Sequence, residues 1–156
     1  MKISIPLQKI TIEDRISHVG ISLHVNGKQA FFLIDTGASR SVLDAERCWF
    51  LGVEPSSGFE DNKIVGIGST QFEITLGIAK TVNIQEIEIK DFPFIILDLT
   101  HINQQLIEAG LSPMDGIIGN DFLMATKAVL NYRKFSLELT LTKKSIKQLR
   151  KSYGQA

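Results

Sequence analysis

The chain has 156 residues, a length that fits one ordinary domain, and 44% of them are apolar, which is enough for a single packed core. Basic and acidic residues are equal at 17 each, and this balance argues against a general nucleic-acid or membrane-surface role, which usually shows as a basic excess. No apolar run is long enough to span a bilayer, and the first six residues lack the apolar stretch of a secretion signal, so we expect a cytoplasmic protein.

The first elements that the sequence predicts form a β-hairpin. Residues 18–25 and 28–34 flank Asn26-Gly27, a dipeptide that favours a two-residue turn because both positions tolerate positive φ. The second strand delivers Asp35 into a small-residue turn. An acid directly after four large apolar residues is costly to bury unless its charge is shared, hydrogen-bonded or used. The pattern indicates a catalytic carboxylate, although Asp-Thr-Gly also makes a good structural turn at the end of a strand.

Short, mostly antiparallel strands are expected over much of the remaining chain. Residues 52–58, which contain Pro55, predict a loop. Period-two alternation and short apolar runs predict strands in five segments: 41–51, where a short helix follows the strand, 64–67, 71–76, 82–89 and 92–97.

The last third of the chain predicts one helix and one further hairpin. Residues 102–109 carry apolar residues at helical spacing and end at Gly110, which suits a helix stop. Residues 128–132 and 135–139 predict a closing hairpin. The fold class that follows is mostly β, with one or two short helices.

The C-terminal residues 143–156 carry five positive charges, and no acidic residue follows Glu138. Such a run is more often a solvated helix face or a frayed terminus than a nucleic-acid contact. We therefore expect one domain over residues 1–142 and a basic tail or helix over 143–156, without a nucleic-acid partner. Binding of RNA or DNA through this tail is the alternative.

Other chemistry-bearing residues are scattered. The lone cysteine, Cys48, excludes an internal disulfide framework and fits a reducing compartment. His18, His24 and His101 show no metal-ligand spacing with Cys48, so no metal site and no cofactor are expected. Trp49 and the nine phenylalanines are interpreted as core or interface residues.

A second motif follows at Asp115–Leu123, where the short apolar strand Ile117-Ile118 meets Gly119 and a predicted helical turn. Together with the Asp35 strand and the glycine-bearing segment Ile64–Thr70, this motif resembles the aspartic protease family of the retroviral type, over roughly residues 18 to 140. In that family the Asp-Thr-Gly strand passes next to an apolar-apolar-Gly strand, whose glycine leaves room for the catalytic loop. The resemblance implies a closed, barrel-like acid protease fold.

The resemblance also implies an aspartic endopeptidase that acts on peptides or proteins. Its chemistry needs two carboxylates that share a proton around one water. Asp115 and Asp121 do not lie in an Asp-Thr-Gly turn, so the simplest source of the second carboxylate is Asp35 of another copy in a symmetric homodimer. The residues expected at the site are Asp35, Thr36 and Gly37 for catalysis, Ala38, Gly66, Ile67 and Gly68 for substrate binding, with Gly66–Gly68 as the flap tip, and Ile117, Ile118 and Gly119 for structural support.

Two departures from the viral enzymes accompany this resemblance. Asn120 stands where retroviral members commonly carry an arginine that braces the dimer. The chain is also longer than a minimal viral protease, and in this it looks more like the bacterial and cellular single-lobed members. The alternative interpretation is a non-catalytic module that keeps this fold to bind an extended peptide or to dimerise a partner. Such a module has no need for an acid at the Asp35 turn.

Overall fold

The computed structural model describes residues 1–60 and 73–151. Strands dominate this part of the chain, which confirms the mostly β class. The strands are β1 (Lys2–Pro6), β2 (Gln8–Ile12), β3 (Arg15–Val25), β4 (Lys28–Ile34), β5 (Val42–Asp44), β6 (Pro55–Glu60), β7 (Glu73–Ile84), β8 (Ile87–Leu97), β9 (Gly116–Ile118), β10 (Val129–Asn131) and β11 (Ser136–Thr140). The helices are η1 (Ala45–Arg47), α1 (Cys48–Leu51), α2 (Thr100–Glu108), α3 (Asn120–Ala125) and α4 (Lys143–Lys151).

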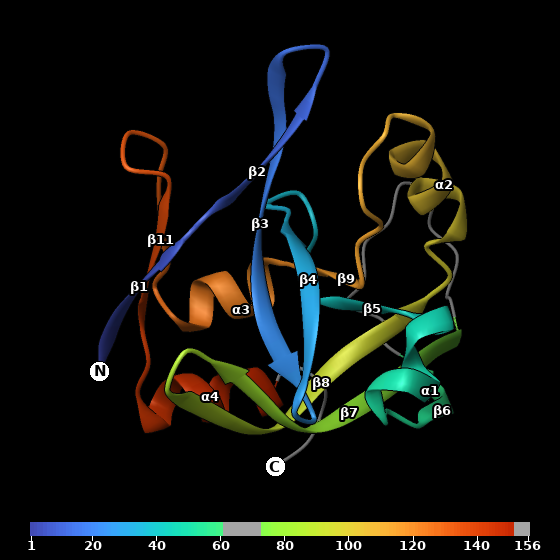
Figure 1. Cartoon of the computed structure of the whole chain (residues 1–156). Helices are drawn as coiled ribbons and strands as arrows, with labels where there is room; N and C mark the ends of the chain where they lie inside the picture. The colour runs from blue at the N-terminus through green and yellow to red at the C-terminus, as the bar shows by residue number, and fades with distance from the viewer. Residues whose placement is uncertain (61–72, 152–156) are drawn as a thin grey trace.

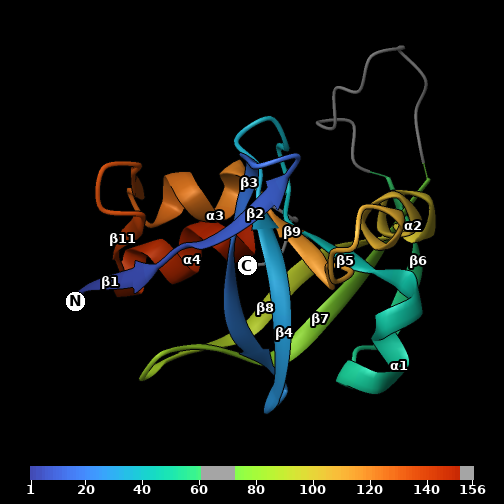
Figure 2. The same cartoon turned by 45° about the horizontal axis from the view of Figure 1, so that its top comes forward.

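The described strands form two sheets. The larger has the order β2-β3-β4-β9-β5-β8-β7-β6, and a further pairing between β3 and β7 leads back from one side of this sheet to the other. The smaller has the order β1-β11-β10 and lies to one side, where the N-terminus begins (Figure 1). The turned view in Figure 2 shows β4 near the centre of the molecule, with β9 beside it.

The central hairpin forms where the sequence predicts it. Strands β3 and β4 pair from Gly20 opposite Leu33 to Val25 opposite Lys28. The turn residues Asn26 and Gly27 have φ of 49° and 81°, the positive values that this dipeptide tolerates.

Short strand β9 lies between two partners, and a glycine makes this arrangement possible. It runs parallel to β4 and antiparallel to β5. A Cβ on Gly116 would lie 2.3 Å from the carbonyl oxygen of Val42 and 2.3 Å from the ring of Phe32. Both neighbours belong to adjacent strands, so a larger residue would push the sheet apart.

Two predicted segments are wrong in detail. Residues 82–89 are not one strand, because β7 ends at Ile84 and β8 begins at Ile87 after a tight turn with Gln85 at φ 52°. Alternation continues on both sides of this turn, and no glycine or proline marks it. The predicted loop 52–58 contains the start of β6 at Pro55. The predicted strand at 64–67 lies outside the described residues.

Aromatic side chains fill the main core. Phe32 and Phe94 stack with ring centroids 5.5 Å apart, and Phe92 contacts Phe122 of α3 at 5.9 Å. All four of these rings are buried. Trp49 is different: it is 92% exposed on α1, so it is not a core residue of this chain.

The C-terminal helix α4 packs against the rest of the protein. Leu149 is 1% exposed and belongs to the main core cluster. Arg150 donates a hydrogen bond to the Lys90 carbonyl at 2.8 Å and lies 3.7 Å from the Asp91 carboxylate, both at β8. Figure 1 shows α4 below α3 at the same side of the molecule. No helix in the described part of the chain is long and apolar enough to cross a membrane.

Candidate active site

The turn after β4 holds the Asp35 carboxylate in one position. The Asp35 amide continues the sheet by donating to the Ile118 carbonyl at 3.0 Å. The Gly37 amide then donates to Asp35 Oδ1 at 2.8 Å, and the Ala38 amide donates to the Asp35 carbonyl at 3.2 Å. Within the described residues the other carboxylate oxygen, Oδ2, has no hydrogen-bond partner. The turn therefore fixes the side chain through one oxygen and leaves the second available.

The carboxylate lies at the surface of the chain. Phe32 is fully buried and Leu33 nearly so, but Asp35, Thr36 and Gly37 are all exposed. A single chain therefore avoids the burial cost that the sequence suggests for this acid. The Thr36 hydroxyl has no hydrogen-bond partner in the part of the chain that the structure describes. The turn thus presents a carboxylate and a hydroxyl to whatever covers it.

Gly119 and Asn120 hold the Asp35 turn from the other side. The Asn120 amide donates to the Ala38 carbonyl at 2.8 Å, and its side chain donates to the Thr36 carbonyl at 2.7 Å. A Cβ on Gly119 would lie 2.7 Å from the Arg40 carbonyl oxygen and 2.8 Å from that of Ala38. Because these are backbone atoms, only glycine fits without moving the turn. No sequence signal indicates that Asn120 braces the turn of its own chain.

A buried polar cluster supports the same loop. Ser41 is fully buried, and its amide and hydroxyl donate to the two oxygens of Asp121 at 3.0 and 2.8 Å. The Ser41 hydroxyl also accepts from the Gly119 amide at 3.1 Å, while Asp121 accepts from the Phe122 amide at 2.8 Å. Asp121 thus ties the loop after the turn to the start of α3, and its carboxylate is occupied.

Replacing Asp121 with alanine should lower the free energy of unfolding by about 2–4 kcal/mol, because it leaves a buried hydroxyl and two amides without their charged acceptor. Urea denaturation measures the change. Glu108→Ala, which removes an exposed carboxylate on α2, is the control and should change stability by less than about 0.5 kcal/mol. Equal small losses in both variants would contradict this role for Asp121.

The Asp115 carboxylate is also held by hydrogen bonds, and it lies away from the Asp35 turn. Its Oδ2 accepts from the Phe31 amide at 2.8 Å, and its Oδ1 accepts from Arg47 Nε at 2.6 Å. Phe31 is the middle residue of β4 and lies four residues before Asp35, so Asp115 lies beside the middle of that strand and away from the turn. Neither Asp115 nor Asp121 supplies a second carboxylate beside Asp35.

Sequence reasoning missed a buried network that positions the segment leading into β9. Asp44 is 3% exposed, and its carboxylate accepts from the Leu99 amide at 3.1 Å and from Asn103 Nδ2 at 3.3 Å. The Asn103 side chain also pairs with the Met114 amide and carbonyl at 2.9 and 3.0 Å. One signal was present: Asn103 is a polar residue among the apolar positions of the predicted helix.

Cys48 lies beside this network as a protonated thiol. Burial raises the pKa of Cys48 above the ordinary 9.0, and the charge of Asp44 raises it further. We expect the folded protein to react with a thiol-specific disulfide reagent at pH 8 at least about 100-fold more slowly than the urea-unfolded chain. Because folding raises this pKa, the free energy of unfolding is independent of Cys48 ionisation below pH 9.0, the ordinary pKa of the unfolded thiol. It falls as the pH rises from there toward the higher pKa of the folded protein. Equal reaction rates in the two states would contradict this account.

The other predicted site residues fall in two groups. Ala38 is half-buried and its carbonyl is held by Asn120, while Ile117 and Ile118 pair with Leu33 and Ile34 of β4. The flap residues Gly66, Ile67 and Gly68 lie outside the described residues. Among the residues that are described, no three His, Cys, Asp or Glu side chains gather as metal ligands.

Comparisons with known proteins identify a family and a shared fold for this chain. The family described as "gag-polyprotein putative aspartyl protease" matches residues 21–125. A retropepsin-like aspartic protease from Rickettsia conorii is 21% identical, with a TM-score of 0.54 and 89% of each chain covered. The retroviral protease-like domain of Ddi1 from Leishmania major is 18% identical, with a TM-score of 0.52, over 83% of this chain and 98% of that one.

A third solved structure, the EIAV protease in complex with the inhibitor HBY-793, is 21% identical, with a TM-score of 0.49, over 78% of this chain and 99% of that one. No curated protein matches the chain. The Rickettsia conorii and Leishmania major structures, at these identities, show that the fold is shared.

Proposed function

Because this chain belongs to the retropepsin-like aspartic protease family, we propose that it is an aspartic endopeptidase whose attacking water is activated between the Asp35 carboxylates of two chains. One observation carries this proposal. The Asp35 side chain is exposed at the surface and fixed through Gly37, with one oxygen open toward a second group.

The proposed chemistry follows from the proximity of two equivalent acids. At a separation of about 3 Å two carboxylates cannot both ionise, so the pair retains one proton. The protonated member polarises the carbonyl of the peptide bond. The ionised member accepts a proton from the attacking water, and proton transfer to the nitrogen releases the amine.

A homodimer is the simplest source of the second carboxylate. The nearby acids Asp115 and Asp121 are both held by hydrogen bonds within the chain. A twofold axis beside the exposed turn would place Asp35 next to its symmetry copy. The Thr36 hydroxyl would then bond to the partner's turn, and Gly37 would let the two backbones approach each other.

The substrate would bind as an extended strand over this turn. In our proposal Ala38 lies against the substrate backbone, and Gly66, Ile67 and Gly68 cover it as a flap, with main-chain hydrogen bonds that supply affinity. Ile117, Ile118 and Gly119 support the turn from the adjacent strand.

The test is cleavage of an unbiased peptide library at several protein concentrations, with sedimentation measured in parallel. Specific activity should rise with protein concentration and reach a plateau where the dimer predominates, because the monomer carries half of the acid pair. Folded dimers that cleave no peptide would contradict the proposal and favour the non-catalytic peptide-binding module. Full specific activity in the monomer would contradict the shared pair.

A further inference from the structure

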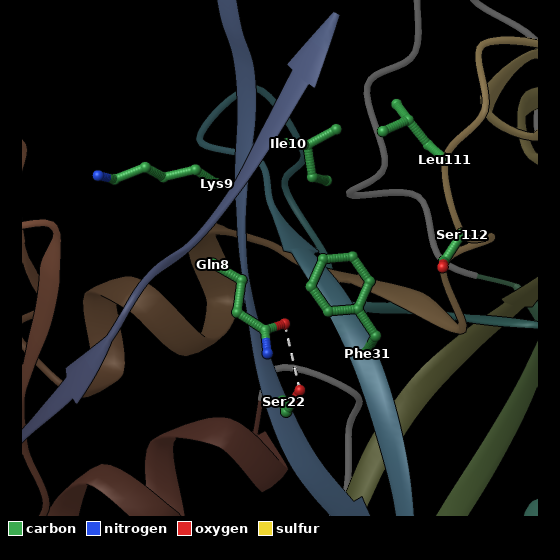
Figure 3. Close-up of a pocket in the computed structure, with 7 residues that line it drawn as sticks. All are labelled: Gln8, Lys9, Ile10, Ser22, Phe31, Leu111 and Ser112. Carbon is green, nitrogen blue, oxygen red and sulfur yellow. Dashed lines mark hydrogen bonds between the residues drawn. The ribbon is translucent and has the colours of Figure 1, made fainter.

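A cavity of about 360 Å³ opens between strands β2, β3 and β4 and the segment that follows α2. Figure 3 shows the residues that surround it, and the mechanism proposed above uses none of them. They are Gln8, Lys9 and Ile10 of β2, Ser22 of β3, Phe31 of β4, and Leu111 and Ser112. The volume is within the range of sites that take small ligands or single side chains.

The cavity lies on the same face of the sheet as the carboxylate. Side chains alternate along a strand, so Phe31 and Leu33 share one face of β4, and continuing the alternation puts Asp35 on that face as well. Ser22 pairs with Phe31 and therefore faces the same way. Four residues of strand advance about 13 Å, which is the approximate Cα separation of Phe31 and Asp35.

A glycine directs the Phe31 ring toward the Asp35 end of the strand. A Cβ on Gly20 would lie 2.5 Å from Phe31 Cζ, so the ring occupies the space that a side chain at position 20 would need. Gly20 pairs with Leu33, which is two residues closer to Asp35 than Phe31 is. The ring thus forms an apolar wall that extends from the cavity toward the carboxylate.

Among the described residues that line the cavity, none directs a charged group inward. Lys9 extends away from the other labelled side chains in Figure 3, and its ammonium lies 4.0 Å from the centroid of the Phe135 ring. The Ser22 hydroxyl donates to Gln8 Oε1 at 3.2 Å, which pairs two of the polar groups with each other. Ile10 and Leu111 complete an apolar lining around Phe31.

We propose, resting on the proposed peptidase function, that this cavity is a subsite for one uncharged, mainly apolar side chain of an extended substrate. The occupant is the residue three or four positions from the cleaved bond, since an extended peptide advances about 3.3 Å per residue. A charged side chain there would lose its hydration without finding an opposite charge, so the subsite should select against Asp and Lys.

The experiment uses an extended decapeptide that the protein cleaves or, if none is cleaved, the one that it binds most tightly, with each position varied in turn among Leu, Ala, Asp and Lys. Because the proposed twofold dimer carries the cavity on both sides of the cleaved bond, residues at equal distances from that bond count as one position. The wild-type protein should prefer Leu over Asp by at least about tenfold in kcat/KM at one position, three or four residues from the cleaved bond. The variant Ser112→Lys places a cation at the exposed rim of the cavity. It should reduce this preference at least about fivefold at that position and leave the other positions unchanged.

Two further variants keep the test decisive. Leu111→Ala enlarges the cavity and should weaken the Leu preference at the same position. Gln85→Lys adds the same charge in the exposed β7–β8 turn and should leave selectivity at every position as in wild type. Unchanged selectivity in both cavity variants, or an equal change in Gln85→Lys, would overturn the proposal.

Failure of the subsite and failure of the peptidase function give different results. Binding of the same peptides is measured by fluorescence anisotropy with Asp35→Asn alone and with Asp35→Asn combined with Ser112→Lys. If no protein cleaves but binding selectivity shifts with Ser112→Lys, the catalytic proposal fails and the subsite stands. If the wild type cleaves and the cavity variants share its selectivity, the subsite fails alone. Absence of both cleavage and peptide binding overturns both.

Discussion

Asp35→Asn is expected to lower kcat/KM for peptide cleavage by at least about a thousandfold, because it removes both members of the acid pair at once. Asparagine can neither accept a proton from water nor donate one to the peptide carbonyl as a carboxylic acid does. The side chain is nearly isosteric, so its oxygen can still accept from the Gly37 amide. Steady-state cleavage of the best library peptide measures the loss.

The same variant supplies its own structural control. Asp35 is exposed in the single chain, so its replacement should change the free energy of unfolding by less than about 1 kcal/mol. Urea denaturation and sedimentation should show a folded protein with the wild-type tendency to dimerise. Retention of more than a tenth of the activity in a correctly folded variant would mean that another group performs the proton transfer.

Gly119→Ala is expected to have the second-largest effect, through the position of the Asp35 turn. The new Cβ would lie 2.7 Å from the Arg40 carbonyl oxygen and 2.8 Å from that of Ala38, so one of these backbone segments must move. Overpacking of this kind costs about 1–3 kcal/mol of stability. A displacement of about 1 Å at a catalytic group can reduce the rate by about 100-fold, so we expect at least that loss in kcat/KM.

Gly110→Ala separates this steric effect from the general cost of replacing a glycine. Gly110 has a φ of 78°, and a Cβ there meets no heavy atom within 4 Å. The variant should lose about 1–2 kcal/mol through backbone strain alone and keep its activity. If Gly119→Ala cleaved peptides as fast as Gly110→Ala, the close contact at Gly119 would not control the position of the carboxylate.

Local sequence signals predict the part of the fold that carries Asp35. Asn26-Gly27 encodes its own positive φ values and hence the hairpin of β3 and β4. Gly110 likewise marks the end of α2, which runs Thr100–Glu108 where the sequence predicts a helix over 102–109. In both cases the signal lies within a few residues of the feature that it determines.

Features that depend on distant contacts could not be predicted in this way. The β7–β8 turn at Gln85 has no turn residue to mark it, and it forms because strands β7 and β8 pair from Leu76 opposite Ile95 to Ile84 opposite Ile87. The link between Asp44 and Asn103 joins residues that are far apart in the sequence and adjacent only in the fold. From the sequence, Asn120 is interpreted as a missing or replaced dimer brace. Its contact with Thr36 forms only because β9 lies beside β4.

The shared acid pair is tested most directly by mixing wild-type protein with Asp35→Asn at a fixed total concentration in the dimeric range. After subunit exchange, a site that needs Asp35 from both chains is active only in wild-type homodimers. Activity should therefore fall as the square of the wild-type fraction, so that an equal mixture retains about one quarter of the wild-type activity. A linear decline, with one half of the activity in the equal mixture, would show that each chain acts alone and would contradict the account.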